Sequence, residues 1–538
     1  MEYRSEIITT SIIFTEKILQ GNMAKAQKTR ASKNPYISQN QLTLTGFESP
    51  FAQSLDPGNR WVILAQKIPW DLLVSTYESR LNNSSMGADG INPRVAIGAM
   101  ILKHICNTSD RETVLQIQEN MYMQYFIGYS SFSNETPFDP SLFVEFRKRL
   151  GIEQINQINE QMLGLHSTKD ERKDPPDDSN MKSDLQTEAS VMPGGSRPEN
   201  AVPNKGRLIT DATACPQDIA YPTDLNLLND AREKSEELID ILYDADLHNK
   251  KPRTYRELAR KDYLRTAQLK LKSKKQIHQA VKKQLAYLRR NIKAINWLLD
   301  QYKTVFPLVG KEHKYLLVIT ILYDQQYRMF KEGGHKVEHR IVSIHQPHVR
   351  PIVRGKTNAY VEFGAKINVS IMNGFVFLDD FSWDAFNEGT RLMSSVEKYR
   401  ARFGCYPEEV LADKIYCNRA NRASLKMLGI KLRAKPLGRP SAVDVEHVRP
   451  GERNPIKGKF GQAKTAYGLN RIRARLSQTS ESWIATIILV LNLVKLIGSG
   501  TYALILSRVT FSARWLVELL GKLLPQGFFL QTLDLKTS

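Results

Sequence analysis

The stretch that decides the fold is Glu409-Val-Leu-Ala-Asp413, followed by a helical pattern over Ala420–Leu428 and by Gly429-Ile-Lys-Leu-Arg433. The first and last pieces have the short apolar pattern of strands, and the middle piece has the spacing of a helix. A strand, a helix and a second strand in this order predict an α/β unit. The first of these strands ends in an acid, Asp413.

Other segments add strands to this unit. Arg207-Leu-Ile-Thr-Asp211-Ala-Thr-Ala reads as a strand that ends in a second acid, Asp211. A helix is expected at Glu397–Phe403, and residues 454–525 are expected to be helical. The remaining predicted strands are Tyr315–Leu322, Arg340–Ile344, Val361–Ile371 and Phe375–Leu378. The pattern predicts an α/β domain with a mixed sheet between helices, over residues 206–500.

Asp211 and Asp413 are the candidate catalytic residues of this domain. Acids at strand ends in α/β sheets gather in one crevice, where two carboxylates repel each other unless a cation lies between them. Oxygen ligands of this kind suit Mg²⁺ or Mn²⁺, and a pair of such ions can activate a water or a 3′-hydroxyl in phosphodiester chemistry. The alternative is that both aspartates serve only turns and caps.

Residues 41–165 have the pattern of an all-α domain built from short helices. Asn92-Pro93 and Asp139-Pro140 each combine a capping residue with a proline, and Ser109-Asp-Arg-Glu112 has capping-box spacing. Such a helix-turn-helix-like bundle serves either DNA binding or dimerisation. The flanking parts are a disordered basic arm at 1–40, in which Met23 is a candidate start, a flexible polar linker at 166–205, and an apolar helical tail at 501–538.

Composition gives the class of partner. Among 538 residues, 76 Lys and Arg face 56 Asp and Glu, so the net charge of +20 favours a polyanion, with nucleic acid first. Four cysteines without a C-x-x-C pair exclude a disulfide framework and a cysteine zinc site, and they fit a reducing cytosol. The apolar run Trp483–Leu491 is too short to span a bilayer, so it is expected to be a core helix, with no membrane partner.

A basic helical insertion is predicted at about 225–310. Between 251 and 290 the sequence has 14 Lys and Arg against Glu257 and Asp262. An apolar stripe from Val281 to Leu299 predicts an amphipathic helix, whose other face either is merely solvated or contacts phosphates. The candidate DNA contacts on that face are Lys282, Lys283, Arg289 and Arg290. Four histidines, at 335, 339, 345 and 348, lack the spacing of a zinc site and are expected on the surface or in strands.

Several motifs together resemble bacterial insertion-sequence transposases of the DDE type, in the insertion-sequence-five family, over roughly 41–500. Two lie in the predicted helical domain and four in the α/β domain. They are Asn92–Ala99, Phe138–Leu150, Thr210–Ile219, Arg350–Lys356, Leu411–Arg422 and Arg453–Lys464.

This resemblance implies an RNase H-like catalytic core that cuts and joins DNA at the inverted ends of a mobile element. It implies Asp211 and Asp413 as the first two acids that bind Mg²⁺ or Mn²⁺, as two ions. The partners would be double-stranded DNA, at element ends and target, and further copies of the chain in a synaptic complex, in the bacterial cytoplasm at the nucleoid. As family positions, Arg453 and Lys464 are expected to hold phosphate oxygens, the alternative being surface solvation. Further candidate DNA contacts are Arg354 and Lys356, in a Gly-containing turn, and Asn418, Arg419 and Arg422, which follow Asp413 on its helix.

The third acid is where the chain departs from the family pattern, which is Arg, three residues, Glu, six residues, Lys, with Tyr three residues before the Arg. Arg453 and Lys464 have the right separation, but the Glu position is Lys457 and the Tyr position is Pro450. Glu452 is a poor substitute, since it lies five residues before Lys457, about 140° around a helix. An ammonium at a position that should ligate a cation predicts impaired catalysis.

Three functions remain open on the sequence. The first is an active or impaired transposase. The second is a catalytically inactive relic that binds element ends and represses related elements. The third is a basic scaffold associated with RNA or the ribosome, for which the two strand-end acids would be incidental.

Overall fold

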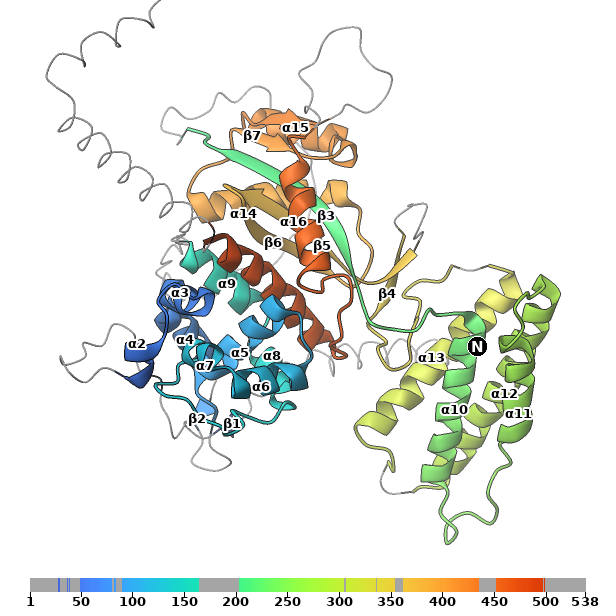
Figure 1. Ribbon diagram of the computed structural model, residues 1–538. Helices are drawn as coiled ribbons and strands as arrows, with labels where there is room; N and C mark the ends of the chain where they lie inside the picture. The colour runs from blue at the N-terminus through green and yellow to red at the C-terminus, as the bar shows by residue number, and fades with distance from the viewer. Residues whose placement is uncertain are drawn as a thin grey trace, which may run out of the picture. The chain divides into compact units, whose positions relative to one another are not determined.

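The computed structural model describes residues 28–29, 36, 38, 49–79, 82–83, 90–163, 203–303, 306–334, 336–353, 361–434, 451–496 and 498. Figure 1 shows the helices and strands that these residues form. The predicted tail, the candidate start at Met23 and most of the predicted linker lie outside the described residues, and of the predicted arm at 1–40 the structure describes residues 28–29, 36 and 38. The chain divides into two compact units, Met1–Phe146 with Leu489–Ser538, and Arg147–Ile488.

Short helices form the first unit. A two-residue strand, β1 (Lys28–Thr29), pairs in parallel with β2 (Asn82–Asn83). The helices up to the unit boundary are α2 (Pro50–Ser54), α3 (Arg60–Lys67), α4 (Trp70–Glu78), α5 (Pro93–Cys106), α6 (Asp110–Glu119) and α7 (Met121–Phe126), and α8 (Leu142–Arg149) follows at the boundary itself.

The predicted starts of two of these helices are confirmed. The Asn92 side chain accepts a hydrogen bond from the Arg94 amide at 2.9 Å, with Pro93 in the first turn of α5. The Ser109 hydroxyl accepts from the Glu112 amide at 3.1 Å at the start of α6. Each cap satisfies an amide that has no partner within its helix, which fixes where the helix begins.

The second unit contains a six-stranded sheet. Its strands are β3 (Arg207–Pro216), β4 (Arg350–Val353), β5 (Val361–Met372), β6 (Phe375–Ser382), β7 (Glu409–Leu411) and β8 (Lys431–Arg433). The order is β4-β5-β3-β7-β8, with β6 also paired to β5. The pairs of β3, β4 and β6 with β5 are antiparallel, whereas β7 is parallel to both β3 and β8. The predicted mixed sheet in an α/β domain is therefore confirmed.

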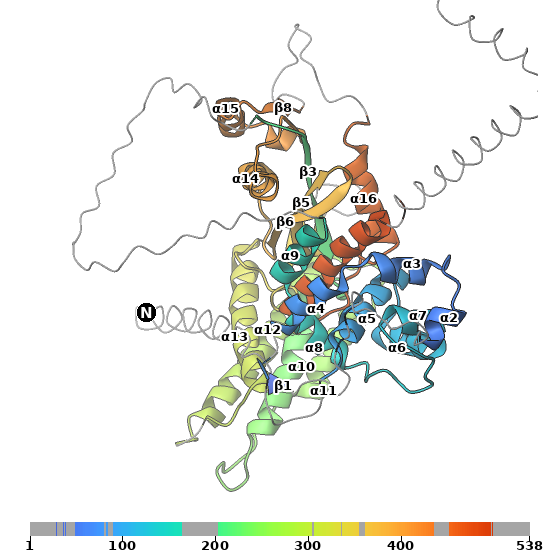
Figure 2. The same ribbon diagram turned by 90° about the vertical axis from the view of Figure 1, so that its left-hand side faces the viewer.

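Helices cover both faces of this sheet. Figure 2 shows the sheet between α14 (Leu392–Phe403) on one side and α16 (Asn454–Thr465) on the other. On the side of α14, Leu208, Val410 and Leu425 of α15 (Arg419–Met427) belong to one buried cluster. Because side chains alternate along a strand, the neighbours of Leu208 and Val410 face α16 instead. The helix α9 (Ile152–Met162) donates side-chain hydrogen bonds to β6 carbonyls.

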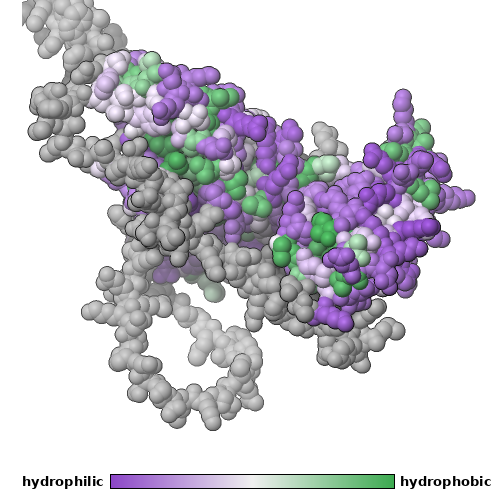
Figure 3. Space-filling view, turned by 90° about the horizontal axis from the view of Figure 1, so that it is seen from below, coloured by the Kyte–Doolittle hydropathy of each residue, from purple (hydrophilic) through white to green (hydrophobic). Residues whose placement is uncertain are grey.

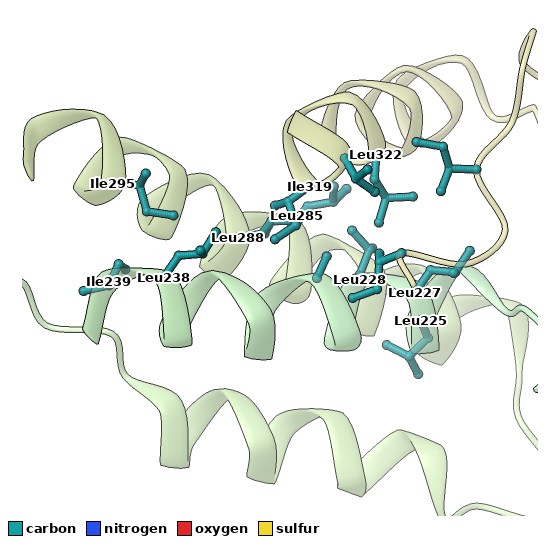
Figure 4. Packing of buried hydrophobic residues seen from close by; sticks show 14 of the residues in the cluster. Leu225, Leu227, Leu228, Leu238, Ile239, Leu285, Leu288, Ile295, Ile319 and Leu322 are labelled. Carbon is teal, nitrogen blue, oxygen red and sulfur yellow. The ribbon is translucent and has the colours of Figure 1, made fainter. Parts of the chain in front are cut away.

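Four helices stand between β3 and β4 in the chain and enclose a core of their own. They are α10 (Asp224–Leu242), α11 (Arg256–Ala267), α12 (Lys274–Leu299) and α13 (Lys311–Glu332). Figure 4 shows how leucines and isoleucines of α10, α12 and α13 interdigitate, among them Leu228, Leu288 and Ile319, which are fully buried. The basic insertion expected at 225–310 is helical, and its core includes α13, which lies beyond residue 310.

The strands expected at Tyr315–Leu322 and Arg340–Ile344 are wrong. Residues 311–332 form α13, whose buried side chains Val318, Ile319, Leu322, Gln326 and Met329 recur at helical spacing. The dense run of β-branched residues suggested a strand, but it is the part of a helix that packs against α10 and α12. Residues 340–344 have no regular structure, and Ile341 and Ile344 fill the same helical core.

An apolar helix, Ser477–Leu496, contains the run Trp483–Leu491. By length and composition it could cross a membrane, but 78% of its most apolar stretch is buried inside the protein. The core helix of a soluble protein also has this length and composition, so these two properties alone do not make Ser477–Leu496 a membrane span. The rest of the segment predicted to be helical, up to residue 525, lies outside the described residues except for residue 498.

Candidate functional site

The sheet brings the two predicted aspartates to corresponding positions along two neighbouring strands, β3 and β7. In the parallel pair of β3 and β7, the last matched residues are Ile209 and Leu411. Asp211 and Asp413 each lie two residues further on, so both side chains leave the sheet on the face that α16 covers. Two residues 202 positions apart in the sequence thus meet at one place.

One detail of the prediction was wrong, because Asp211 does not end its strand. β3 continues to Pro216, since β5 pairs with it as far as Gly364. Only β7 stops, at Leu411, and the chain then turns into the short helix η2 (Lys414–Tyr416), where the Asp413 carboxylate accepts from the Lys414 amide at 2.8 Å. The site is therefore a step in the sheet, where β3 runs on beyond its shorter neighbour.

Arg453 joins the two carboxylates. Its guanidinium lies 3.0 Å from an Asp211 oxygen through Nη2 and 3.0 Å from an Asp413 oxygen through Nη1. The Arg453 and Asp211 side chains are 14% and 16% exposed, whereas Asp413 is 59% exposed. The site therefore has one shielded and one open carboxylate.

Burial sets the electrostatics of Asp211. Loss of water raises the pKa of its carboxyl above the usual range, and the nearby Arg453 charge opposes that shift. Two further acids, Glu388 and Asp413, also raise the Asp211 pKa because their negative charges repel its own. The site therefore holds more negative charge than the two predicted aspartates account for.

The helix α16 begins directly after Arg453 and carries two further predicted site residues, Lys457 and Lys464. Ile456 and Ala463 are fully buried beneath the helix. Lys457 and Lys464 lie four and eleven residues after Arg453, which places all three within about 40° of one another on one helix face. Lys457 is exposed and lies one turn from Arg453, and Lys464 is half-buried two turns further on.

The donor atoms of the two aspartates are of the kind that binds a divalent cation. The Arg453 guanidinium already occupies the place between them as a stand-in cation, and oxygen-only donors suit Mg²⁺ or Mn²⁺. Among the described residues, however, no group of three or more His, Cys, Asp or Glu side chains is close enough to hold a metal ion. Glu452 is turned away to Arg433, at 3.5 Å. Two carboxylates alone therefore leave most of the coordination to water or to groups that must move.

The other predicted DNA contacts of the α/β domain differ in what their side chains do. Asn418 caps α15 through the Asn421 amide at 2.8 Å. Arg419 and Arg422 are exposed on that helix. Arg354 and Lys356 lie outside the described residues, as does Pro450.

The predicted contacts on the insertion are all exposed residues of α12. Figure 3 views the molecule from below and shows a largely hydrophilic surface on the right-hand lobe, which these helices form. Lys283 is paired with Asp262 at 2.9 Å, and the Arg290 guanidinium lies over the rings of Tyr255 and Tyr287. Lys282 and Arg289 have no ion-pair partner in the described part of the chain.

The histidines do not form a metal site among the described residues, which exclude His335. His348 packs against Trp383 with ring centroids 4.4 Å apart, and its Nε2 is buried. Burial and the charges of Lys314 and Arg350 lower the His348 pKa to about 4, so the ring is neutral at physiological pH. The Nδ1 atom of His345 forms a hydrogen bond of 2.9 Å with the Tyr315 hydroxyl.

Sequence reasoning missed two groups beside the site, Glu388 and Lys366, which pair at 2.9 Å. Glu388 lies in the short helix η1 (Glu388–Thr390), and Lys366 lies in β5. The sequence feature that could have indicated Glu388 is its position between the predicted strand Phe375–Leu378 and the predicted helix Glu397–Phe403. That signal is weak, because acids in such connections are common.

Comparison with known proteins shows which families the chain is similar to. Residues 49–149 match the family model described as Transposase domain (DUF772), and residues 410–494 match the Transposase DDE domain. A relative described as "Uncharacterized protein ORF8 in nfe locus", from Rhizobium meliloti, is 28% identical over 173 residues, 32% of this chain and 69% of the relative. No solved structure matches the chain. The second match contains Asp413, Arg453, Lys457 and Lys464, and the two domain matches together indicate a DDE-type transposase.

Proposed function

We propose that the chain is a transposase of the insertion-sequence-five type, with an RNase H-like core, that binds the inverted-repeat ends of its element and acts on them by metal-dependent cleavage and strand transfer. One observation carries this proposal: Asp211 and Asp413 converge on one guanidinium at a step in the sheet. The strand arrangement supports it, since three antiparallel strands followed by two parallel ones suit an RNase H-like core. The protein would act at the nucleoid of a bacterial cell.

In this mechanism the protein supplies charge and position. Asp211 and Asp413 would hold Mg²⁺ or Mn²⁺, as two ions when DNA is bound. A bound divalent cation lowers the pKa of a water or 3′-hydroxyl nucleophile and stabilises the leaving oxygen. Arg453, released from the carboxylates, is then free to hold a phosphate oxygen through its forked donors, and Lys464 adds a second positive charge on the same helix face. Lys457 adds positive charge where the family resemblance places a ligating carboxylate.

A second candidate function follows from Lys457. A chain that keeps its DNA contacts but binds the cation poorly would occupy element ends without cutting them, and would repress related elements by blocking their ends. The two functions share the binding step and differ in the chemical step. DNA cleavage therefore separates them, whereas DNA binding tests both against an RNA-associated scaffold.

The binding step has a direct test. We expect the full-length chain to retard a DNA fragment that carries the inverted repeat of its element, with an affinity at least about 10-fold higher than for a scrambled fragment of equal length, because specific complexes exceed non-specific ones by more than this. Gel-shift titration with Mg²⁺, and with unlabelled DNA or RNA as competitor, measures this preference. Equal affinity for the two DNA fragments, or stronger competition by RNA, would reject both candidates.

The insertion has its own test through the salt dependence of DNA binding. Replacing Lys282 and Arg289 together by glutamine should reduce the slope of log affinity against log salt by about 1.8, since each lost phosphate contact removes about 0.9. Fluorescence anisotropy between low and moderate salt measures this slope. The matched control removes two charges from Lys251 and Arg256, which are already paired with Asp240 at 2.8 and 2.9 Å. An equal loss in both variants would mean that net charge alone, and no defined surface, binds the DNA.

A further inference from the structure

Two tyrosines on α13 form a stacked pair at the surface of the helical insertion. The rings of Tyr323 and Tyr327 are nearly parallel, with an interplanar angle of 16° and centroids 5.9 Å apart. Tyr323 packs against the core of the four helices, whereas Tyr327 is 46% exposed. The Tyr327 ring therefore keeps apolar surface in water that a further planar group could cover. Both residues lie outside the two family matches, at 49–149 and 410–494.

The helix α12 runs alongside α13 in the opposite direction. Near one end, His278 of α12 stacks on Phe330 of α13, with ring centroids 4.4 Å apart. Further along α12, Leu285 belongs to the same buried cluster as Ile319, which comes earlier on α13, and Figure 4 shows the two beside each other. Residue numbers therefore rise along one helix as they fall along the other. The two contacts fix which parts of α12 and α13 are neighbours.

Cations of α12 line the edge beside the tyrosine pair. Lys282 and Arg289 are exposed and lie within about 40° of His278 around the helix, so they share the face whose edge touches α13. Lys282 lies between the two contacts along α12, as Tyr323 and Tyr327 do along α13. Arg289 lies one turn beyond, but long helical side chains lean toward the N-terminus. Burial raises the pKa of Tyr323, and the Arg289 charge opposes that shift, which agrees with this placement.

The tyrosine–cation face, defined as Tyr323, Tyr327, Lys282 and Arg289, combines two kinds of group. Its cations suit the phosphates of any nucleic acid, and its rings suit the flat faces of bases. In a duplex the neighbouring base pairs cover these faces, so a protein ring reaches them only where a strand is unpaired. The exposed acid Asp324 lies about 100° around α13 from Tyr323, on the side away from α12.

We propose that the tyrosine–cation face binds single-stranded DNA, with a base stacked on the Tyr327 ring and phosphates held by Lys282 and Arg289. This inference rests on the proposed function, because cutting and exchanging strands is what makes unpaired DNA available to this chain. Tyr323 is a positioning residue, since its ring packs against the helical core on one side and against Tyr327 on the other.

The test compares two probes on the full-length protein by fluorescence anisotropy, with EDTA present to prevent cleavage. One probe is a labelled DNA strand of about 16 nucleotides from the inverted repeat, and the other is the same strand paired with its complement. Tyr327→Ala should bind the single strand about 10-fold more weakly, because one stacked base is lost. Its affinity for the duplex should stay within about 2-fold, since no positive charge is removed.

Two further variants make the comparison specific to the ring. Tyr327→Phe should keep the wild-type affinity for both probes, because stacking needs the ring and not the hydroxyl. Tyr221→Ala is the matched control, since it removes another tyrosine that is 72% exposed and lies outside these helices, and it should change neither affinity. Replacing Lys282 and Arg289 together by glutamine should weaken the binding of both probes, since each contacts phosphate.

The outcomes separate this inference from the proposed function. If Tyr327→Ala changes neither affinity, or lowers both equally, the stacking role is refuted, and a wild type that still prefers the inverted repeat over a scrambled duplex leaves the proposed function standing. If the wild type shows no such preference, the proposed function itself fails. Tighter binding of an RNA strand of the same sequence than of the DNA strand would make RNA the ligand of this face and would overturn the inference.

Discussion

Replacing Lys457 by glutamate should raise the rate of Mg²⁺-dependent cleavage at element ends by about 10² to 10³-fold. The expected gain is large because the substitution removes a positive charge one helical turn from Arg453 and adds a carboxylate on the same face of α16. A cation held by a complete set of ligands contributes several kcal/mol to the transition state, and each 1.36 kcal/mol is a factor of ten in rate.

The measurement is single-turnover cleavage of a labelled fragment that carries the inverted repeat, with Mg²⁺ and with EDTA. Lys459→Glu is the matched control, because it makes the same charge change on the same helix about 160° around from Lys457, where the Lys459 ammonium contacts Gln462. Equally fast cleavage by the wild type and by Lys457→Glu would disprove the impairment. Equal gains in Lys457→Glu and Lys459→Glu would assign the effect to net charge.

The sequence predicted the two aspartates correctly as a pair, although its reason was only partly right. The rule that acids gather at strand ends holds for Asp413, but Asp211 lies inside a longer strand. The pairing succeeds because the register of β3 and β7 matches positions 209 and 411. Strand length depends on the partner β5, and no local pattern near Asp211 contains that information.

The errors have a common physical origin. The run at 315–322 is rich in β-branched residues, yet it forms α13, because α10 and α12 offer an apolar groove that a helix fills. Glu388 was missed because its position depends on Lys366 of β5, which pairs with it, and on Asn421 of α15, which donates to the carbonyl of the next residue, Gly389. In both cases tertiary contacts decide, and sequence spacing cannot report them.

Arg453 shows how a motif can be right in position while its role depends on what is bound. The family resemblance implied that Arg453 contacts a phosphate, and the structure pairs it instead with both carboxylates. Arg453 can fill the two roles one after the other. Before a cation enters, the Arg453 guanidinium balances the charge of the two aspartates. Once the aspartates bind the cation, the guanidinium remains beside the site, where a phosphate can replace the aspartates as its anionic partner.

Asp211→Asn and Asp413→Asn should each abolish the cleavage gained by Lys457→Glu, a loss of about 10² to 10³-fold. The double variant should lose no more than either single one, because two ligands of one cation act as a unit and their effects do not add. Asp218→Asn is the control, since Asp218 follows the same strand but pairs with Arg471 on the surface at 2.9 Å.

The comparison is decisive because the two aspartates differ in exposure, at 16% and 59%. If they acted separately, the shielded Asp211 would have the larger effect, and the double variant would multiply the two losses. Gel-shift affinity for the element end should stay within about 2-fold for all three variants, since no positive charge that could contact phosphate is removed. Losses that multiply would show that Asp211 and Asp413 do not share a cation, even though one guanidinium now joins them.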